Sequence, residues 1–138
     1  MLGMTKSYLD ALTYKIIGAA IEVHKNLGPG LLESVYQRCL EHEFQLRGIS
    51  FISQPIVPVY YKDIELDAFL RCDLLVENRI VVELKAVETI NPIFTAQLLT
   101  YMKLLDAPKG ILMNFNCINL FKDGQKAYVN DLFSLLPD

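Results

Sequence analysis

The segment from 71 to 85, RCDLLVENRIVVELK, reads as two hydrophobic strands that carry charged residues inside them. Apolar side chains recur with a period of two on both sides of a polar turn, as in a half-buried β-hairpin. A two-residue turn would set Leu74 against Glu83 and mismatch the faces, whereas a three-residue loop, 77–79, brings all the apolar side chains onto one face. The expected facing pairs are Val76–Ile80, Leu74–Val82 and Cys72–Leu84.

The same register places Asp73 opposite Glu83 and Arg71 opposite Lys85 on the second face. Like charges in facing positions destabilise a sheet, so we expect a compensating group. A divalent cation is one candidate, because Mg²⁺ is typically bound by one or two carboxylates with waters and a phosphate oxygen. Lys85 points to the same side as Glu83 and could orient or deprotonate a water. The alternative is an exposed sheet face on which Lys85 or Arg71 neutralises the acids.

The first third of the chain has helical periodicity. Apolar residues recur every three or four positions over about 8–27 and again over about 31–47, and GPG at 28–30 separates the two helices. Gly48 marks the end of the second helix. The expected apolar positions are Leu12, Ile16, Ala20, Val23 and Leu27, followed by Leu32, Val35, Tyr36, Cys39, Leu40 and Phe44.

After Gly48 the period changes to two. QPIVPVYY, 54–61, contains two prolines that cannot donate to a ladder, so it predicts an edge strand. The hairpin strands extend over 66–76 and 79–87. Asn91 and Pro92 predict an N-cap and the first position of a helix that reaches about Asp106, and KGILMNF at 109–115 predicts a buried strand. The tail from 117 gives no firm assignment.

The composition is that of one globular domain, residues 1–138, with 52% hydrophobic and 21% charged residues. Cys39, Cys72 and Cys117 are widely spaced, which favours reduced thiols in a cytoplasmic protein. The apolar run IIGAAI is too short for a membrane span, and no export signal is recognisable, so no membrane partner is expected.

The net charge of −3 and the pI of about 5.4 lack the basic footprint that is common in nucleic-acid-binding proteins. Basic residues collect between Lys103 and Lys126. They are interrupted by Asp106 and Asp123, which favours a solvated face.

Two polar residues lie outside the hairpin at positions that attract attention. Gln97 occupies a helical stripe with Phe94, Tyr101 and Leu105, where it is expected to be buried and to need a partner. Glu33 lies in the first turn of the second helix. It either contacts the helix N-terminus favourably or is a third acid directed at the hairpin acids.

GLLESVY, 30–36, resembles the G-x-x-E-x-x-Y signature of the GxxExxY protein family, a branch of the PD-(D/E)XK nuclease superfamily. The likeness extends from about Leu12 to Val129. It includes AIEVHKNLGPG, RCDLLVENRIVVELKAVE, AQLLTYMKLL and GILMNF. One departure is Lys126-Ala127, where members of the family tend to carry a Lys-Arg pair.

The resemblance implies an α/β (mixed α+β) fold, with a restriction-endonuclease-like αβββαβ core, a mixed central sheet and an extra N-terminal helix. It also implies a site. Mg²⁺ or Mn²⁺ would be held by metal ligands from Glu33, Asp73, Glu83 and the Leu84 carbonyl. Lys85 would position the attacking water, and Gln97 would orient Lys85 or contact the nucleic-acid backbone. Tyr36, Tyr101 and His24 would support the site, and each also has a purely structural interpretation.

The leading functional hypothesis is therefore a Mg²⁺-dependent nuclease of nucleic acids, for which DNA is favoured over RNA as the substrate. The alternative is a non-catalytic nucleic-acid-binding or protein-interaction module that retains the nuclease fold. Because the acidic chain carries no added DNA-binding module, a homodimer or a protein partner is considered for substrate capture.

Overall fold

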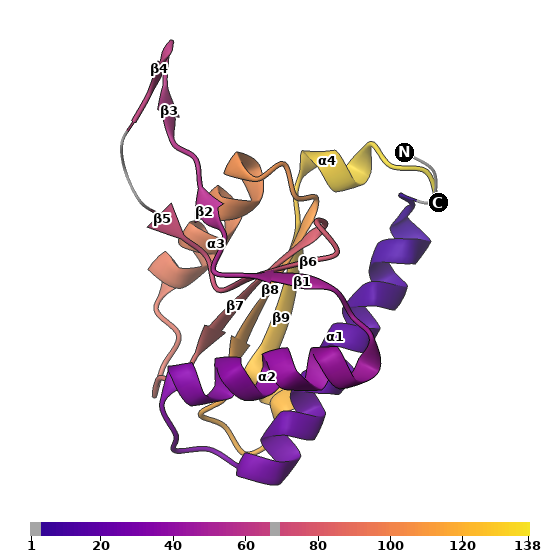
Figure 1. Cartoon of the computed structure of the whole chain (residues 1–138), viewed down its shortest axis with the longest axis vertical. Helices are drawn as coiled ribbons and strands as arrows, with labels where there is room; N and C mark the ends of the chain where they lie inside the picture. Colours follow the sequence, from indigo (N-terminus) through magenta and orange to yellow (C-terminus); the bar gives the residue numbers. More distant parts are fainter. Residues whose placement is uncertain (1–3, 67–69) are drawn as a thin grey trace.

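The computed structural model describes residues 4–66 and 70–138 (Figure 1). Its helices are α1 (Lys6–Leu27), α2 (Glu33–Arg47), α3 (Pro92–Leu104) and α4 (Asp131–Ser134), with a π-helical turn, η1 (Leu120–Gly124). Its strands are β1 (Phe51–Ser53), β2 (Ile56–Val57), β3 (Tyr60–Tyr61), β4 (Ile64–Glu65), β5 (Leu70–Arg71), β6 (Leu74–Val76), β7 (Ile80–Lys85), β8 (Lys109–Asn114) and β9 (Gln125–Val129).

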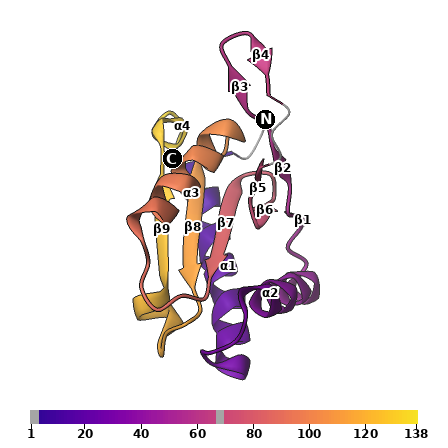
Figure 2. The ribbon, with the colours of Figure 1, turned by 90° about the vertical axis from the view of Figure 1, so that its left-hand side faces the viewer.

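A five-stranded mixed sheet forms the centre of the molecule, in the order β1-β6-β7-β8-β9. β7 and β8 are parallel and are joined through α3, while the other neighbours are antiparallel. α1 and α2 lie on one side of this sheet and α3 lies on the other (Figure 2). This arrangement is the expected mixed α+β fold of the restriction-endonuclease-like type, with α1 as the additional N-terminal helix.

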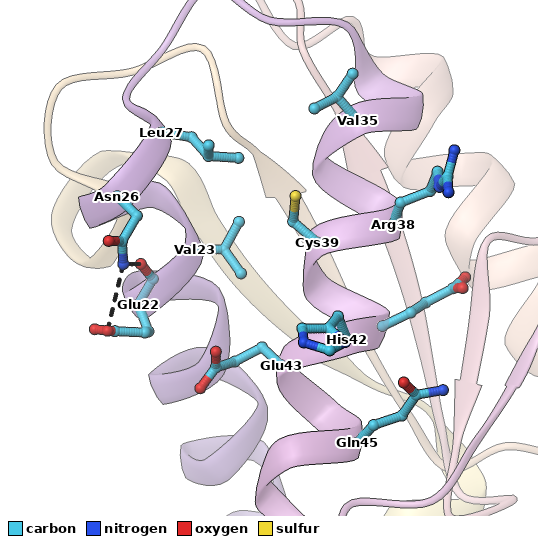
Figure 3. A pocket seen from close by; sticks show the side chains of 11 residues that line it. Glu22, Val23, Asn26, Leu27, Val35, Arg38, Cys39, His42, Glu43 and Gln45 are labelled. Carbon is cyan, nitrogen blue, oxygen red and sulfur yellow. Dashed lines mark hydrogen bonds between the residues drawn. The ribbon is translucent and has the colours of Figure 1, made fainter.

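The helices of the first layer are well delimited. The Thr5 side chain accepts a hydrogen bond from the Tyr8 N–H at the start of α1, and Gly28, with φ of 70°, ends it. Three residues expected on the apolar faces are exposed instead: Leu27, Leu32 and Val35. They flank the connection between α1 and α2, beyond the part of each helix that the sheet covers. Leu27 and Val35 line an open cavity of about 750 Å³ between the two helices (Figure 3).

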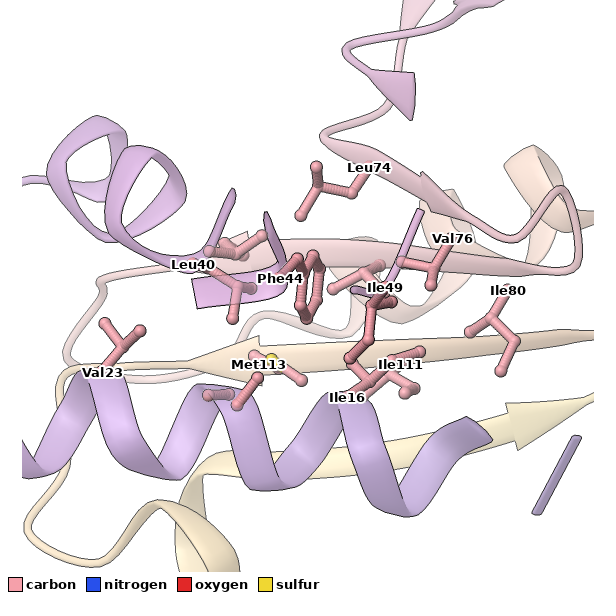
Figure 4. Close-up of a cluster of buried hydrophobic side chains, with 14 of the residues drawn as sticks. Ile16, Val23, Leu40, Phe44, Ile49, Leu74, Val76, Ile80, Ile111 and Met113 are labelled. Carbon is pink, nitrogen blue, oxygen red and sulfur yellow. The ribbon is translucent and has the colours of Figure 1, made fainter. Parts of the chain in front are cut away.

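Two hydrophobic clusters fill the space on the two faces of the sheet. Figure 4 shows the cluster beneath α1 and α2, which includes Ile16, Leu40, Phe44, Leu74 and Ile111. The cluster beneath α3 contains Leu75, Val81, Leu98, Tyr101 and Met102. Since side chains alternate along a strand, Val82 and Leu84 face the first cluster, and Val81 and Glu83 face α3.

The hairpin register is confirmed. Leu74 pairs with Val82 and Val76 pairs with Ile80. The three-residue loop 77–79 closes the hairpin, with Glu77 and Asn78 at φ of 53° and 55°. The burial of one apolar face therefore determined the pairing, as the alternation predicted.

The predicted strand 66–76 is wrong as a single strand, because the chain bends at Cys72 and Asp73 between β5 and β6. Cys72 joins the cluster beneath α3 rather than the face of Leu84. Arg71 pairs with Ile56 in the small β2–β5 sheet rather than with Lys85. Positions 67–69 of the predicted strand lie outside the described residues.

The predicted edge strand 54–61 is also divided, because Pro55 and Pro58 interrupt the ladder. Its residues contribute to β2 and β3, and the edge of the central sheet is formed by the earlier β1. β3 and β4 form a hairpin that projects from the body of the molecule (Figure 1).

β9 and α4 lie in the tail that gave no sequence assignment. β9 adds to β8 in antiparallel orientation and leaves most of its residues exposed.

Cys39, Cys72 and Cys117 are free thiols, although only Cys72 is buried. Among the described residues, no helix has the length and apolar character needed to span a membrane.

Candidate functional site

The carboxylates of Asp73 and Glu83 each accept a hydrogen bond from a backbone N–H of the opposite strand, at the end of the β6–β7 hairpin. The Asp73 N–H donates to Glu83 Oε1 at 2.8 Å, and the Leu84 N–H donates to Asp73 Oδ2 at 2.8 Å. In a continued ladder the Leu84 N–H would bond to the carbonyl of Cys72, so the Asp73 carboxylate has replaced a backbone acceptor. Each acid is thus fixed by the backbone of the opposite strand.

The bend that allows this exchange is held from two other elements. The Asp73 carbonyl accepts hydrogen bonds from the Gln37 side-chain amide at 3.0 Å and from the Gln54 N–H at 2.8 Å. Gln37 is buried in α2 and also donates to Glu41 at 3.1 Å. Gln37 is not among the residues predicted from the sequence. One feature of the sequence could have indicated Gln37: it is a polar residue next to Tyr36 and four positions after Glu33. It therefore lies on the same side of the helix as Glu33, and this side is buried at Gln37.

Burial is the main electrostatic influence on the two hairpin acids. Desolvation and then the negative charge of Asp73 raise the pKa of Glu83 from 4.5 to about 8. Desolvation also raises the pKa of Asp73, although the Leu84 N–H opposes the rise. Neither acid therefore ionises readily in the absence of a cation.

Glu33 is the first residue of α2 and lies close enough to sense the hairpin acids. Burial raises the pKa of its carboxyl, the charge of Asp73 raises it further, and Lys85 lowers it. The loop before Glu33 is fixed by Tyr36, whose hydroxyl donates to the Gly28 carbonyl and accepts from the Leu31 N–H at 3.1 Å.

The Tyr36 ring is fully buried and stacks on Phe115 of the β8–η1 connection, with 4.6 Å between ring centroids. This packing anchors the first turn of α2 to the core. In the GLLESVY segment, Tyr36 therefore orients the helix start from which Glu33 projects.

Lys85 follows Glu83 by two positions and lies at the same end of β7. Its ammonium nitrogen is 4.3 Å from the centroid of the Phe94 ring, a cation–π contact. Within residues 4–66 and 70–138, Lys85 makes no ion pair with a carboxylate at 4.0 Å or less. The charge of Lys85 lowers the pKa values of the three acids, but only as a secondary influence.

Tyr101 lies in the cluster beneath α3, on the side of the sheet that Glu83 faces. Burial raises the pKa of its hydroxyl, the charges of Glu83, Cys72 and Asp73 raise it further, and hydrogen bonding to Gln97 lowers it. Gln97 itself is exposed, so the expectation of a buried amide is wrong. The buried stripe of α3 runs through Leu98, Tyr101 and Met102, which leaves Gln97 at its edge.

His24 is buried on α1, and its Nε2 lies 2.8 Å from the carbonyl oxygen of Cys117. This contact joins α1 to the β8–η1 connection. Glu33, Lys85 and Tyr101 thus lie within electrostatic range of the hairpin acids, Asp73 and Glu83, with Gln97 beside Tyr101, whereas His24 and Tyr36 contact the surrounding scaffold. The cavity in Figure 3 is lined by α1 and α2 residues and by none of the hairpin acids.

The donor set can be tested against a metal ion. Among the described residues, no group of three or more His, Cys, Asp and Glu side chains is arranged as metal ligands. The site therefore does not fit a cation held entirely by protein groups. It does fit a hydrated hard cation, which needs one or two carboxylates. The second oxygens of Asp73 and Glu83 are free of hydrogen bonds to the described part of the chain.

The comparisons with known proteins agree with this geometry. The family model of the PD-(D/E)XK nuclease superfamily matches residues 10–127, a range that contains all of the residues discussed above. Nucleases of this superfamily usually use divalent metals and act on nucleic acids. Neither the curated proteins nor the solved structures give a significant match. Since the match spans most of the sequence and includes the acids of the hairpin, the chain belongs to the PD-(D/E)XK nuclease superfamily.

Proposed function

We propose that this protein is a Mg²⁺- or Mn²⁺-dependent nuclease of the GxxExxY branch, in which residues 1–138 act as one cytoplasmic domain that hydrolyses phosphodiester bonds in DNA. The observation that carries the proposal is the pair formed by half-buried Asp73 and buried Glu83, whose carboxylates are fixed by opposite strands and have raised pKa values. Two acids that ionise reluctantly beside each other gain most from a cation, because the cation removes their mutual repulsion.

Asp73 and Glu83 are the proposed direct carboxylate ligands, with the Leu84 carbonyl as a third protein ligand. Glu33 is proposed to complete the site through a coordinated water, because the described residues hold no group of three acids arranged as direct ligands. The N–H and C=O of one strand residue point to the same side. Because the Leu84 N–H is bonded to Asp73, its carbonyl is also directed toward that side of β7. The bound cation would neutralise phosphate charge and acidify a coordinated water.

Lys85 is the proposed positioning group for the attacking water and for the charge that develops on the phosphorus oxygens. Since Lys85 lies on Phe94 rather than in an ion pair with the acids, its N–H donors remain available for water or phosphate. Water attacks phosphorus and gives up a proton to solvent, the bond to the leaving oxygen breaks, and that oxygen takes a proton from solvent. Gln97, which is exposed beside Tyr101, is proposed to contact the backbone of the substrate or to orient Lys85.

A cleavage assay tests this proposal. The wild type should cut single-stranded, double-stranded or branched DNA in millimolar Mg²⁺ or Mn²⁺ and should be inactive in EDTA. Lys85→Ala should remain folded and bind metal, because neither a ligand nor core packing is lost, yet cleavage should fall by roughly 10²-fold or more. Lys103→Ala is the matched control, because Lys103 is an exposed lysine in the last turn of α3.

A non-catalytic module is the competing function, and the net charge of −3 favours it. In that case Lys85 would serve only as a counter-charge to the acids. The Lys85→Ala variant would then be less stable than the wild type in metal-free buffer and would regain that stability when metal is added. The wild type would cut no nucleic acid. For either function, we propose that a second copy or a protein partner assists substrate capture, which light scattering with and without DNA would reveal.

A further inference from the structure

A row of facing residues runs across the sheet from the site to its outer edge. Glu83 of β7 faces Leu112 of β8, and Leu112 faces Lys126 of β9. Facing residues share one side of a sheet, so Lys126 projects on the same side as Glu83. Neighbouring strands lie about 4.8 Å apart, which sets the Lys126 backbone about 10 Å from that of Glu83.

α3 covers only part of this side of the sheet. It packs closely over Gly110, where an added Cβ would approach Met102 Sδ to 2.6 Å. Two positions further along β8, beside Leu112 and Asn114, a groove of about 400 Å³ opens between the sheet, η1 and the β7–α3 loop. Its lining residues are Ile90, Leu112, Asn114, Lys122, Asp123, Gly124, Gln125, Lys126 and Tyr128.

Asn114 connects this groove to the site. It faces Lys85 across the parallel pair of strands, and its side chain is locked by the β7–α3 loop: it accepts from the Val87 N–H at 3.1 Å and donates to the Val87 carbonyl at 2.9 Å. The wall between the groove and Lys85 is therefore rigid.

The groove carries two exposed lysines and one acid, Asp123. Lys126 is partly preorganised, because its ammonium nitrogen lies 5.5 Å from the Tyr128 ring, and the Tyr128 hydroxyl lies 3.4 Å from Thr95 Oγ1 on α3. Lys122 extends from η1, whose first turn is capped by the Asn119 side chain. Both cations thus come from structured backbone.

We propose that this groove binds a backbone phosphate of the substrate on one side of the cleaved bond, with Lys122 and Lys126 as its cationic contacts. The inference rests on the proposed nuclease function and adds the direction of the strand, from the acids across β8 toward β9. A spacing of about 10 Å corresponds to an offset of about three nucleotides or fewer, at 3.4 Å per phosphate along the axis. Among the lysines between 103 and 126, Lys122 and Lys126 are then more than a solvated face.

Binding of a fluorescein-labelled DNA oligonucleotide, followed by anisotropy in EDTA at several salt concentrations, tests this subsite. Lys126→Gln and Lys122→Gln should each weaken binding and lower the salt slope by about 0.7–0.9, and the double variant by about 1.5. Asp123→Asn should tighten binding, because it removes a negative charge beside the phosphate. A tighter variant cannot be explained by misfolding. Lys15→Gln, an equal charge change on the α1 layer, should leave the slope unchanged.

The same variants are then assayed for cleavage in Mg²⁺, where Lys126→Gln should raise KM and leave kcat nearly unchanged. Three results would overturn the subsite. The salt slope of the double variant could be unchanged, Lys15→Gln could lower the salt slope as much as the lysine variants of the groove do, or the wild type could bind no DNA. If the slopes change as expected but no substrate is cut, the subsite stands and the nuclease function fails. If DNA is cut and the slopes do not change, the function stands and the subsite fails.

Discussion

Replacing Glu83 by glutamine should stabilise the metal-free protein at neutral pH. Because burial raises the pKa of Glu83 from 4.5 to about 8, the folded protein retains a proton in this range that the unfolded chain has released. The free energy of unfolding therefore falls as the pH rises from 4.5 to about 8. Glutamine stays neutral and keeps the Oε1 atom that accepts from the Asp73 N–H.

The size of the effect follows from the pKa shift of Glu83, because each pH unit between the unfolded and folded pKa values lowers the free energy of unfolding by about 1.4 kcal/mol. At pH 7 the wild type should have lost about 3 kcal/mol that the Glu83→Gln variant retains, while at pH 5 the difference should be under about 1 kcal/mol.

Urea unfolding, followed by circular dichroism from pH 5 to pH 8 in EDTA, measures both curves. The wild type should lose stability across this range, and the Glu83→Gln curve should be flatter. Glu65→Gln, on the exposed β4 strand, is the control for removing a carboxylate and should follow the wild type. If Glu83→Gln is less stable than the wild type throughout, contacts hold the carboxylate ionised and the argument from burial fails.

Three further changes test the parts of the site. Millimolar Mg²⁺ or Mn²⁺ should raise the melting temperature of the wild type more than that of Asp73→Asn, and equal shifts by scanning fluorimetry would place the metal elsewhere. Gln37→Met should lower metal affinity by about 10-fold or more in calorimetric titration, because the Asp73 bend loses one of its two holding bonds. Tyr36→Phe should cost about 1–3 kcal/mol in urea unfolding, since Gly28 and Leu31 lose their partner; unchanged stability would contradict this.

The central hairpin could be predicted from the sequence because its pairing obeys a local rule. A slip of one residue would have moved Leu74, Val76, Ile80 and Val82 away from the core, so only one register was compatible with burial. The N-cap at Asn91 was equally local, and its side chain accepts from the Ile93 N–H as expected.

Features that depend on distant parts of the chain were not predicted. The bend at Asp73 is held by Gln37, which is 36 residues away, and no local pattern announces that contact. Gln97 was predicted to be buried because helical spacing on α3 allows two neighbouring apolar stripes. The stripe that is buried runs through Leu98 and Met102, which pack against Gly110 of β8, and this contact could not be predicted from the spacing. β9 was missed because an edge strand with a mostly exposed surface carries little alternation.

The two bonds that link Asp73 to Glu83 and to Leu84 also bear on the order in which the site is assembled. Their partners are only 10 and 11 residues apart, and an isolated hairpin closes within microseconds, so these acids can meet early in folding. Their burial and the shielding of Glu83 arrive later, when α3 and β8 dock on the sheet. A chain still on the ribosome, with β8 not yet released, would hold the acids without the environment that binds a cation between them. We therefore expect metal binding and cleavage to begin only with the complete fold.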